Sequence, residues 1–120
     1  MSAVLARQQA STCTNPILDL YVTHAGMLIN VSILEFQIFD ISDSTKYANP
    51  VQVYPAIVGN RQTVNLAACP GGDRISTGRY VAKWTPTNTE ALGLHEVRWF
   101  FKLSPLDQEL TSSETFDVII

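Results

Sequence analysis

The strictest constraint on the fold is a stretch near the C-terminus in which apolar and polar residues alternate one by one. Between positions 95 and 103 every second side chain suits a protein core, and mostly charged side chains fill the places between them. The two sets are Val97, Trp99, Phe101 and Leu103, and Glu96, Arg98, Phe100 and Lys102. Because successive side chains of a strand point to opposite faces, this alternation predicts a long strand with one buried face.

Shorter alternations recur along the chain between turn signals. They predict further strands at 17–23, 33–40, 51–54, 62–66, 79–84 and 111–120. Proline cannot donate to a strand ladder, so Pro55 marks 51–54 as an edge strand or a bulge. Residues 42–50 are rich in turn formers and are expected to form a loop. About seven strands without a convincing long helix predict an antiparallel sandwich or barrel over residues 17–120.

Residues 1–16 lack this alternation and form a separate N-terminal arm in our interpretation. They contain no aromatic residue, several Gln, Ser, Thr and Asn residues, and a closing Pro16. Fully extended, such a segment reaches about 50 Å. Two hypotheses stay open: a frayed terminus, or a tether laid on a neighbouring subunit.

Composition excludes several classes of protein. The chain has 120 residues, of which 46% are hydrophobic and 16% charged, so a disordered tail is excluded for most of it. The formal net charge is -3 and the basic residues are dispersed, which argues against a nucleic-acid partner. No apolar run approaches the roughly 20 residues that a membrane helix needs, so no membrane partner is expected.

The two cysteines leave the redox state open. The apolar stretch at the start is four residues long and Arg7 follows it, which is not the pattern of a secretory signal. We therefore expect synthesis in a reducing cytosol, where Cys13 and Cys69 stay thiols. The alternative is a disulfide that forms late, in a particle released from the cell. It would join Cys13 to Cys69, or Cys13 to a neighbouring copy.

No motif predicts catalysis, a cofactor or a metal. His24 falls in a predicted turn and His95 at a strand start, and both are expected to be solvated or to cap a turn. No pair of Cys or His has the spacing of zinc ligands. Asp40 and Asp43 flank a turn, where Asx hydrogen bonding explains them better than calcium does. The glycine-rich segment 71–78 precedes a strand, whereas a phosphate loop precedes a helix.

Two aromatic residues stand out because they occupy the polar phase of their strands. Phe39 and Phe100 are each flanked by polar neighbours, and an exposed aromatic in such a setting is a common interface anchor. Glu96, Arg98 and Lys102 would form a charged rim around Phe100. The other hypothesis is that a loop or the arm covers the rings, or that the phase is wrong there. The interface candidates are Phe39, Phe100, Arg98 and, on the arm, Cys13.

One part of the chain resembles a known family. The segments 78–84 (GRYVAKW) and 92–99 (LGLHEVRW), with the connection 86–93, resemble the late strands of immunoglobulin-like sandwiches. There a Gly-x-Tyr opens one strand and a Leu-Gly turn leads into the next. More narrowly, the chain resembles the small Ig-like virion proteins of tailed bacteriophages, namely capsid decoration (cement) and head–tail neck proteins. The resemblance covers about 17–120, and its specific part is about 78–103. Ala82 stands where an antibody domain would have a core cysteine.

The resemblance implies an all-β protein, an antiparallel Ig-like β-sandwich with an extended N-terminal arm. It implies a structural virion protein, not an enzyme, that stabilises a capsid or head–tail assembly. Its expected partners are the major capsid or other virion structural proteins, in many copies, with residence in the virion after synthesis in the host cytoplasm. The alternative is a carbohydrate- or protein-binding Ig-like surface module that uses loops at one end of the sandwich, such as 42–50 and 69–78.

Overall fold

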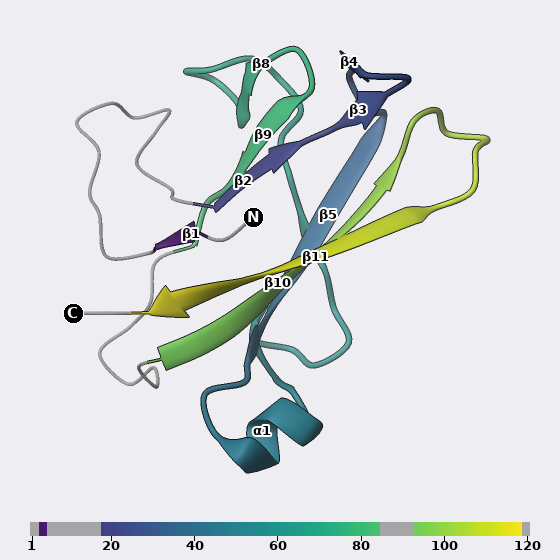
Figure 1. Cartoon of the computed structure of the whole chain (residues 1–120). Coiled ribbons are helices and arrows are strands. Elements are labelled where there is room, and N and C mark those ends of the chain that lie inside the picture. Colours follow the sequence, from purple (N-terminus) through teal and green to yellow (C-terminus); the bar gives the residue numbers. More distant parts are fainter. Residues whose placement is uncertain (1–2, 5–17, 85–92, 119–120) are drawn as a thin grey trace.

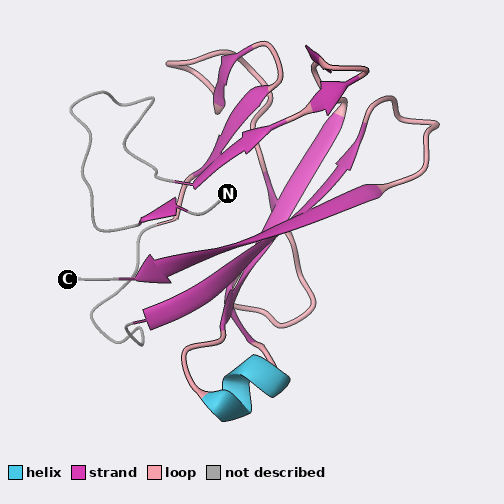
Figure 2. Ribbon diagram, in the orientation of Figure 1, coloured by secondary structure: helices cyan, strands magenta, loops and turns pink. Residues whose placement is uncertain are grey.

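The protein is built almost entirely of strands. The computed structural model describes residues 3–4, 18–84 and 93–118, and eleven strands and one short helix lie in them (Figures 1 and 2). Two sheets enclose a common core, which confirms the predicted all-β antiparallel sandwich. The strands outnumber the seven or so expected because four of them are two residues long, too short to show an alternation.

Sheet A forms the larger layer. Its order is β1–β11–β10–β5–β6, and β7 pairs with the first half of β5. All pairs in this sheet are antiparallel except β1–β11, which is parallel. The strand bounds are β1 Ala3–Val4, β5 Ile33–Asp40, β6 Val51–Tyr54, β7 Gln62–Thr63, β10 Gly93–Lys102 and β11 Leu110–Val118.

Sheet B forms the second layer and is smaller. It contains β2, β9 and β8 in that order, and a separate hairpin of β3 and β4 follows β2. Figure 1 shows β8 and the hairpin at the top of the molecule, beyond the upper end of β5. The bounds are β2 Leu18–Tyr21, β3 Thr23–His24, β4 Met27–Leu28, β8 Arg74–Ser76 and β9 Arg79–Ala82.

The core consists of the inward side chains of both sheets. The central ring is Trp99, which is fully buried and packs against Phe36 with 5.6 Å between ring centroids. Most of the alternation predicted from the sequence is confirmed by burial. The buried inward residues include Leu18, Leu20, Leu34, Phe36, Ile38, Tyr80, Ala82, Val97, Trp99, Phe116 and Val118.

The Gly-x-Tyr sequence fastens sheet B to the chain that leads into β5. Gly78 has φ +71°, and a Cβ there would lie 2.8 Å from the carbonyl oxygen of Val22. Two residues on, the buried hydroxyl of Tyr80 accepts a hydrogen bond from the backbone N–H of Val31 at 3.0 Å. The backbone N–H of Gly78 donates to Oδ1 of Asn30 at 2.9 Å. The motif therefore positions β5, whose side chains contribute to both faces of sheet A.

The bounds of two predicted strands are confirmed. The predicted strands 33–40 and 51–54 coincide with β5 and β6, and β6 lies at the edge of sheet A as Pro55 indicated. The register between β5 and β6 shifts between Ile38 and Phe39, so that edge also has the irregularity that Pro55 predicted. The predicted strand 62–66 is shorter, since only Gln62 and Thr63 pair. Residues 85–92, which hold most of the 86–93 connection, lie outside the described residues.

The expected loop 42–50 contains the helix α1 (Ser44–Ala48), so the prediction of a loop throughout this segment was wrong. The carboxylate of Asp43 caps it by accepting from the backbone N–H of Lys46 at 2.8 Å. None of the helical residues is buried. A helix without a buried face has no apolar periodicity, which is why the sequence pattern did not reveal it.

The arm contributes a strand to its own chain. Ala3 lies beside Phe116 and Val4 beside Asp117, so β1 extends sheet A at the outer edge of β11. In Figure 1, β1 lies next to the arrowhead of β11. These two residues are therefore paired within the single chain, and the rest of the arm, 1–2 and 5–16, lies outside the described residues.

Candidate functional site

The interface candidates on the strands meet on the outer face of sheet A. Phe39 of β5 lies opposite Glu96 of β10, and Phe100 of β10 lies opposite Glu35 of β5. Both rings therefore occupy the polar phase, as the sequence indicated. We call this surface the outer face; it is formed by Glu35, Gln37, Phe39, Glu96, Arg98, Phe100 and Arg61.

Two hypotheses were open for Phe39, an exposed anchor or a covered ring, and the structure shows a covered ring. Its residue exposure is 9%, and the guanidinium Cζ of Arg98 lies 3.9 Å from the ring centroid. The Nε of Arg98 donates to Oε1 of Glu96 at 2.6 Å, on the same strand. A cation above an aromatic face is attracted by the ring quadrupole. Arg98 therefore acts as a cap on Phe39, with Glu96 holding the cap in place.

Phe100 is half-buried beneath a different arginine. The Cζ of Arg61 lies 3.6 Å from its ring centroid. Nη1 of Arg61 donates to Oε2 of Glu109 at 2.8 Å and lies 3.6 Å from Oε1 of Glu35. The hydrogen bond to Glu109 and the two nearby carboxylates outweigh burial and raise the pKa of Arg61. Glu96, Arg98 and Lys102 alternate along β10 in the same phase as Phe100, and the cap on the ring comes in addition from Arg61, which the sequence pattern did not indicate.

A shallow depression lies beside the Phe100 ring. Its volume is about 330 Å³, and it is lined by Arg98, Phe100, Thr111, Ser112 and Ser113. Thr111 and Ser113 of β11 lie opposite Phe100 and Arg98, so an aromatic ring, a guanidinium and two hydroxyls share this side of the sheet. Such a surface offers hydrogen bonds in both directions next to an apolar contact, as the rim of a protein interface does.

A protruding apolar loop adjoins the outer face. Ile57 and Val58 are 67% and 79% exposed, between β6 and β7. The loop is held by Gln52, whose Oε1 accepts from the backbone N–H of Gly59 at 3.0 Å. Nε2 of Gln37, on the outer face, donates to the carbonyl oxygen of Asn60 at 2.9 Å. The two apolar side chains are therefore presented by a fastened loop. These two residues were not predicted as functional, although an apolar pair between Pro55 and Gly59 was a signal in the sequence.

The cysteine predictions remain open. Cys69 is half-buried in the turn before β8, and its Sγ lies 3.2 Å from the carbonyl oxygen of Gly72. Cys13 lies outside the described residues. Both the disulfide between Cys13 and Cys69 and the role of Cys13 in an interface therefore stay predictions.

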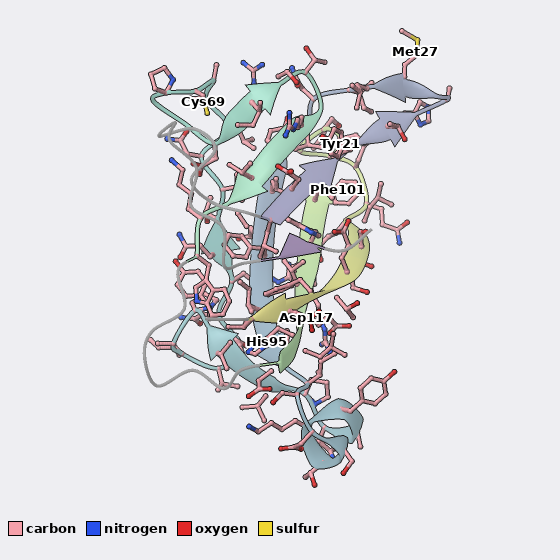
Figure 3. The ribbon with its side chains drawn as sticks, turned by 60° about the vertical axis from the view of Figure 1, so that its left-hand side comes forward. Tyr21, Met27, Cys69, His95, Phe101 and Asp117 are labelled. Carbon is pink, nitrogen blue, oxygen red and sulfur yellow. The ribbon has the colours of Figure 1, made fainter. Side chains whose placement is uncertain are left out.

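The two histidines occupy opposite environments. His24 is exposed on the β3–β4 hairpin, as expected. His95 is fully buried, so the expectation of a solvated or capping side chain was wrong. Its ring lies 6.1 Å from Trp84 and 5.8 Å from Phe116, and Figure 3 places it inside the sandwich. Nδ1 lies 3.0 Å from the carbonyl oxygen of Gly93, and Nε2 has no hydrogen-bond partner among the described residues. This histidine is a core residue in phase with the strand.

The acidic pair near α1 does what turn chemistry predicts. Oδ1 of Asp40 accepts from the backbone N–H of Ser42 at 2.9 Å, and Oδ2 pairs with Nζ of Lys46 at 2.9 Å. Burial by itself raises the pKa of Asp40, but these bonds and the nearby His95 outweigh it and lower the pKa below its usual value. In residues 3–4, 18–84 and 93–118, no three His, Cys, Asp or Glu side chains gather as metal ligands would.

The loops of the alternative binding module lie at opposite ends. Figure 1 shows α1, within 42–50, at the bottom of the molecule and β8, within 69–78, at the top. Figure 3 likewise shows Cys69 at the top and the helix at the bottom. The expectation that these two loops share one end of the sandwich was therefore wrong.

No helix in the described residues has the length and apolar character of a membrane span.

Comparison of the chain with protein-family models, with curated proteins and with solved structures gives no match.

Proposed function

We propose that this chain is a structural protein that docks on a larger, many-copy assembly through the outer face of sheet A and the adjoining loop. The observation that carries the proposal is the combination of two arginine-capped phenylalanines, Phe39 and Phe100, with the exposed pair Ile57 and Val58. Aromatic residues and arginine are the types enriched at protein interfaces, and arginine is prominent among hot spots.

The charge on this face supports a protein partner. Arg61 and Arg98 face Glu35, Glu96 and Glu109, so the acidic and basic groups nearly balance. A balanced surface does not favour a polyanion, whose binding depends on a clear excess of positive charge. A partner that covers the loop would bury its apolar side chains and strengthen the ion pairs by excluding water.

The assembly that we propose is a virion. This step rests on the resemblance of residues 78–103 to the Ig-like virion proteins of tailed bacteriophages, with a capsid decoration role first and a neck role second. In a cementing mechanism each copy contributes a modest contact, and many copies multiply it. The N-terminal arm adds reach between copies, and residence in the virion follows from this role.

The first test measures the size of the native assembly. The tagged chain is expressed in the cells that naturally produce it, and the released particles are separated by density-gradient sedimentation. The experiment is repeated with reductant, to test whether disulfides hold the chain on the particles. We expect the chain to sediment with particles far larger than its 13.3 kDa mass. A stable monomer that associates with no particle would overturn the proposal.

The second test locates the docking surface. Replacing Ile57 and Val58 together by serine is expected to reduce particle association at least tenfold without unfolding the protein. The matched control is Met27→Ser, because Met27 is also 71% exposed but lies on the β3–β4 hairpin (Figure 3). Equal loss in both variants would remove the outer face from the proposal.

The third test concerns the arm. Deletion of residues 1–16 is expected to abolish particle association while leaving the sandwich folded. The urea unfolding midpoint of the truncated chain should fall only by the small amount that the two residues of β1 contribute. Full association of the truncated chain would show that the arm is not a tether. A glycan array probed with the intact chain tests the alternative of a carbohydrate-binding module.

A further inference from the structure

β1 is a strand added at the edge of sheet A. It pairs only with β11 among the described strands, in parallel, whereas all other pairs between named strands are antiparallel. The register is short, with Ala3 beside Phe116 and Val4 beside Asp117. β1 therefore completes no hairpin, and its place on β11 can be filled by the same strand of another molecule without changing any other pair.

The length of chain between β1 and β2 allows such an exchange. Thirteen residues, 5–17, separate Val4 from Leu18. At roughly 3.3–3.6 Å per residue this connection reaches about 45 Å. The longest extent of the protein is 37 Å. A neighbouring copy can therefore accept the arm wherever its β11 lies within about 45 Å of Leu18.

We propose that β1 is exchanged between copies, so that β1 of one copy pairs with β11 of the next in the register seen within the single chain. This proposal rests on the proposed function, because only a many-copy assembly keeps neighbours close enough. The exchanged and the closed forms contain the same β1–β11 contacts, as in domain swapping. If each copy donates to the next and not back to the same partner, the contact links copies into a ring or an array.

The outer edge of β11 could pair with either of two strands of a second copy, its β1 or its β11. The residues along this edge favour β1. On the β1 side of β11, residues 110–115 pair with no described strand. Within that stretch Glu114 lies opposite Val97, so it belongs to the inner face, near Asp19 of sheet B. An inward-pointing charge at a sheet edge opposes edge-to-edge pairing of two sheets. The acceptor is therefore the Phe116–Asp117 end, which already accepts β1.

Concentration decides between the closed and the exchanged form. A connection of this length gives the closed form an effective concentration of about 1 mM. In dilute solution β1 therefore stays on its own chain. Copies held side by side on a particle exceed that concentration locally, and exchange becomes favourable without any new contact.

The test uses the purified full chain alone, in a background with Cys13→Ser and Cys69→Ser. One sample carries Val4→Cys and a second carries Asp117→Cys, and the two are mixed in a glutathione redox buffer. A disulfide between them is favoured when β1 of one copy lies on β11 of another, because the two positions are register partners, and otherwise forms only by random collision. We expect this mixed dimer to be abundant near 1 mM protein and about 100-fold less abundant, relative to the closed form, at about 10 µM.

Two controls make the result specific. Each variant alone gives the background of self-dimers, and Val4→Cys mixed with Thr111→Cys tests a position on the same strand that is out of register. A mixed dimer that exceeds both controls supports the exchange. A yield at about 1 mM that does not exceed them overturns it, even if particle association is normal. Loss of particle association with a normal mixed dimer would instead overturn the docking function, so the two failures are distinguishable.

Discussion

The two faces of the strand pair β5–β10 are held by different physical interactions. On the inner face Trp99 and Phe36 pack ring against ring, and both residues are buried. On the outer face Phe100 lies one residue further along β10, and its ring is partly covered by the Arg61 guanidinium, which pairs with the carboxylates of Glu35 and Glu109. Adjacent residues of one strand thus serve two purposes. The inner one stabilises the fold, and the outer one prepares a surface.

The difference shows where the free energy of folding is concentrated. Burial of a large ring is worth several kcal/mol, because apolar area is removed from water and packing is close. A cation above a partly exposed ring is worth about 0.5–1 kcal/mol. The outer face can therefore change its contacts when a partner arrives without threatening the fold.

The largest expected effect tests the inner face. Trp99→Ala should destabilise the protein by about 3–5 kcal/mol, because it leaves a cavity between the sheets. Phe100→Ala on the outer face should cost less than half as much, because that ring is only half-buried. Urea unfolding of both variants measures the ratio. Equal losses would mean that the two faces do not differ as described.

The next effect concerns the hydrogen bond that joins sheet B to the chain leading into β5. Tyr80→Phe leaves the backbone N–H of Val31 without its partner, and Val31 is 7% exposed. An unsatisfied buried donor costs about 1–3 kcal/mol. Tyr47→Phe is the matched control, because Tyr47 is 67% exposed, and it should change stability by less than about 0.5 kcal/mol. A loss at Tyr80 no larger than at Tyr47 would contradict the role of this hydroxyl.

The inner face was largely predictable from the sequence, and the outer face was not. Inward positions follow from alternation within one strand, which is a local property, so Leu34, Val97 and Trp99 were assigned correctly. The same rule applied to His95 would have placed it in the core, because it shares a phase with Val97 and Trp99. The expectation failed because histidine was judged by its chemistry and not by its position.

The caps depend on contacts that no local pattern contains. Arg98 covers a ring on the neighbouring strand, and Arg61 reaches Phe100 from a loop 39 positions earlier in the chain. Strand register and loop course decide both contacts, and neither can be read from spacing. The short pairing of β1 with β11 is equally non-local, since it joins the two ends of the sequence.

A third prediction concerns acid. Asp40 has a pKa below 3.8 in the folded protein, so its contribution to stability is present above pH 3.8 and is lost as pH falls through the lower folded value. Asp40→Asn should therefore lower the urea midpoint at pH 7 and leave it unchanged once the wild-type carboxyl is protonated. Midpoints measured across that range test this. A difference that persists at the lowest pH would mean that shape, not charge, sets the role of Asp40.

A smaller effect is expected for the caps themselves. Arg61→Ala should cost about 0.5–1 kcal/mol, because a cation–π contact and two partly exposed ion pairs are lost. Arg61→Lys keeps the charge but not the flat stacking, and should recover only part of the loss. In about 1 M salt the difference between Lys and Ala should shrink, since exposed ion pairs are screened. A loss of several kcal/mol for Arg61→Ala would mean that the outer face belongs to the folding core.

The smallest effect has the opposite sign and concerns Glu114, which lies on β11 at the edge of sheet A. Burial first, and then the neighbouring Asp19, raise the pKa of Glu114, so its charged form destabilises the folded state at neutral pH. Glu114→Gln should therefore stabilise the protein by about 0.5 kcal/mol or less at pH 7. The gain should vanish below pH 4.5, where the wild-type carboxyl is also neutral. If the charge opposes pairing between sheet edges, the same variant should self-associate more strongly at pH 7 in sedimentation-velocity runs. If the variant is more stable but does not self-associate more strongly, the charge of Glu114 is not what opposes pairing at this edge.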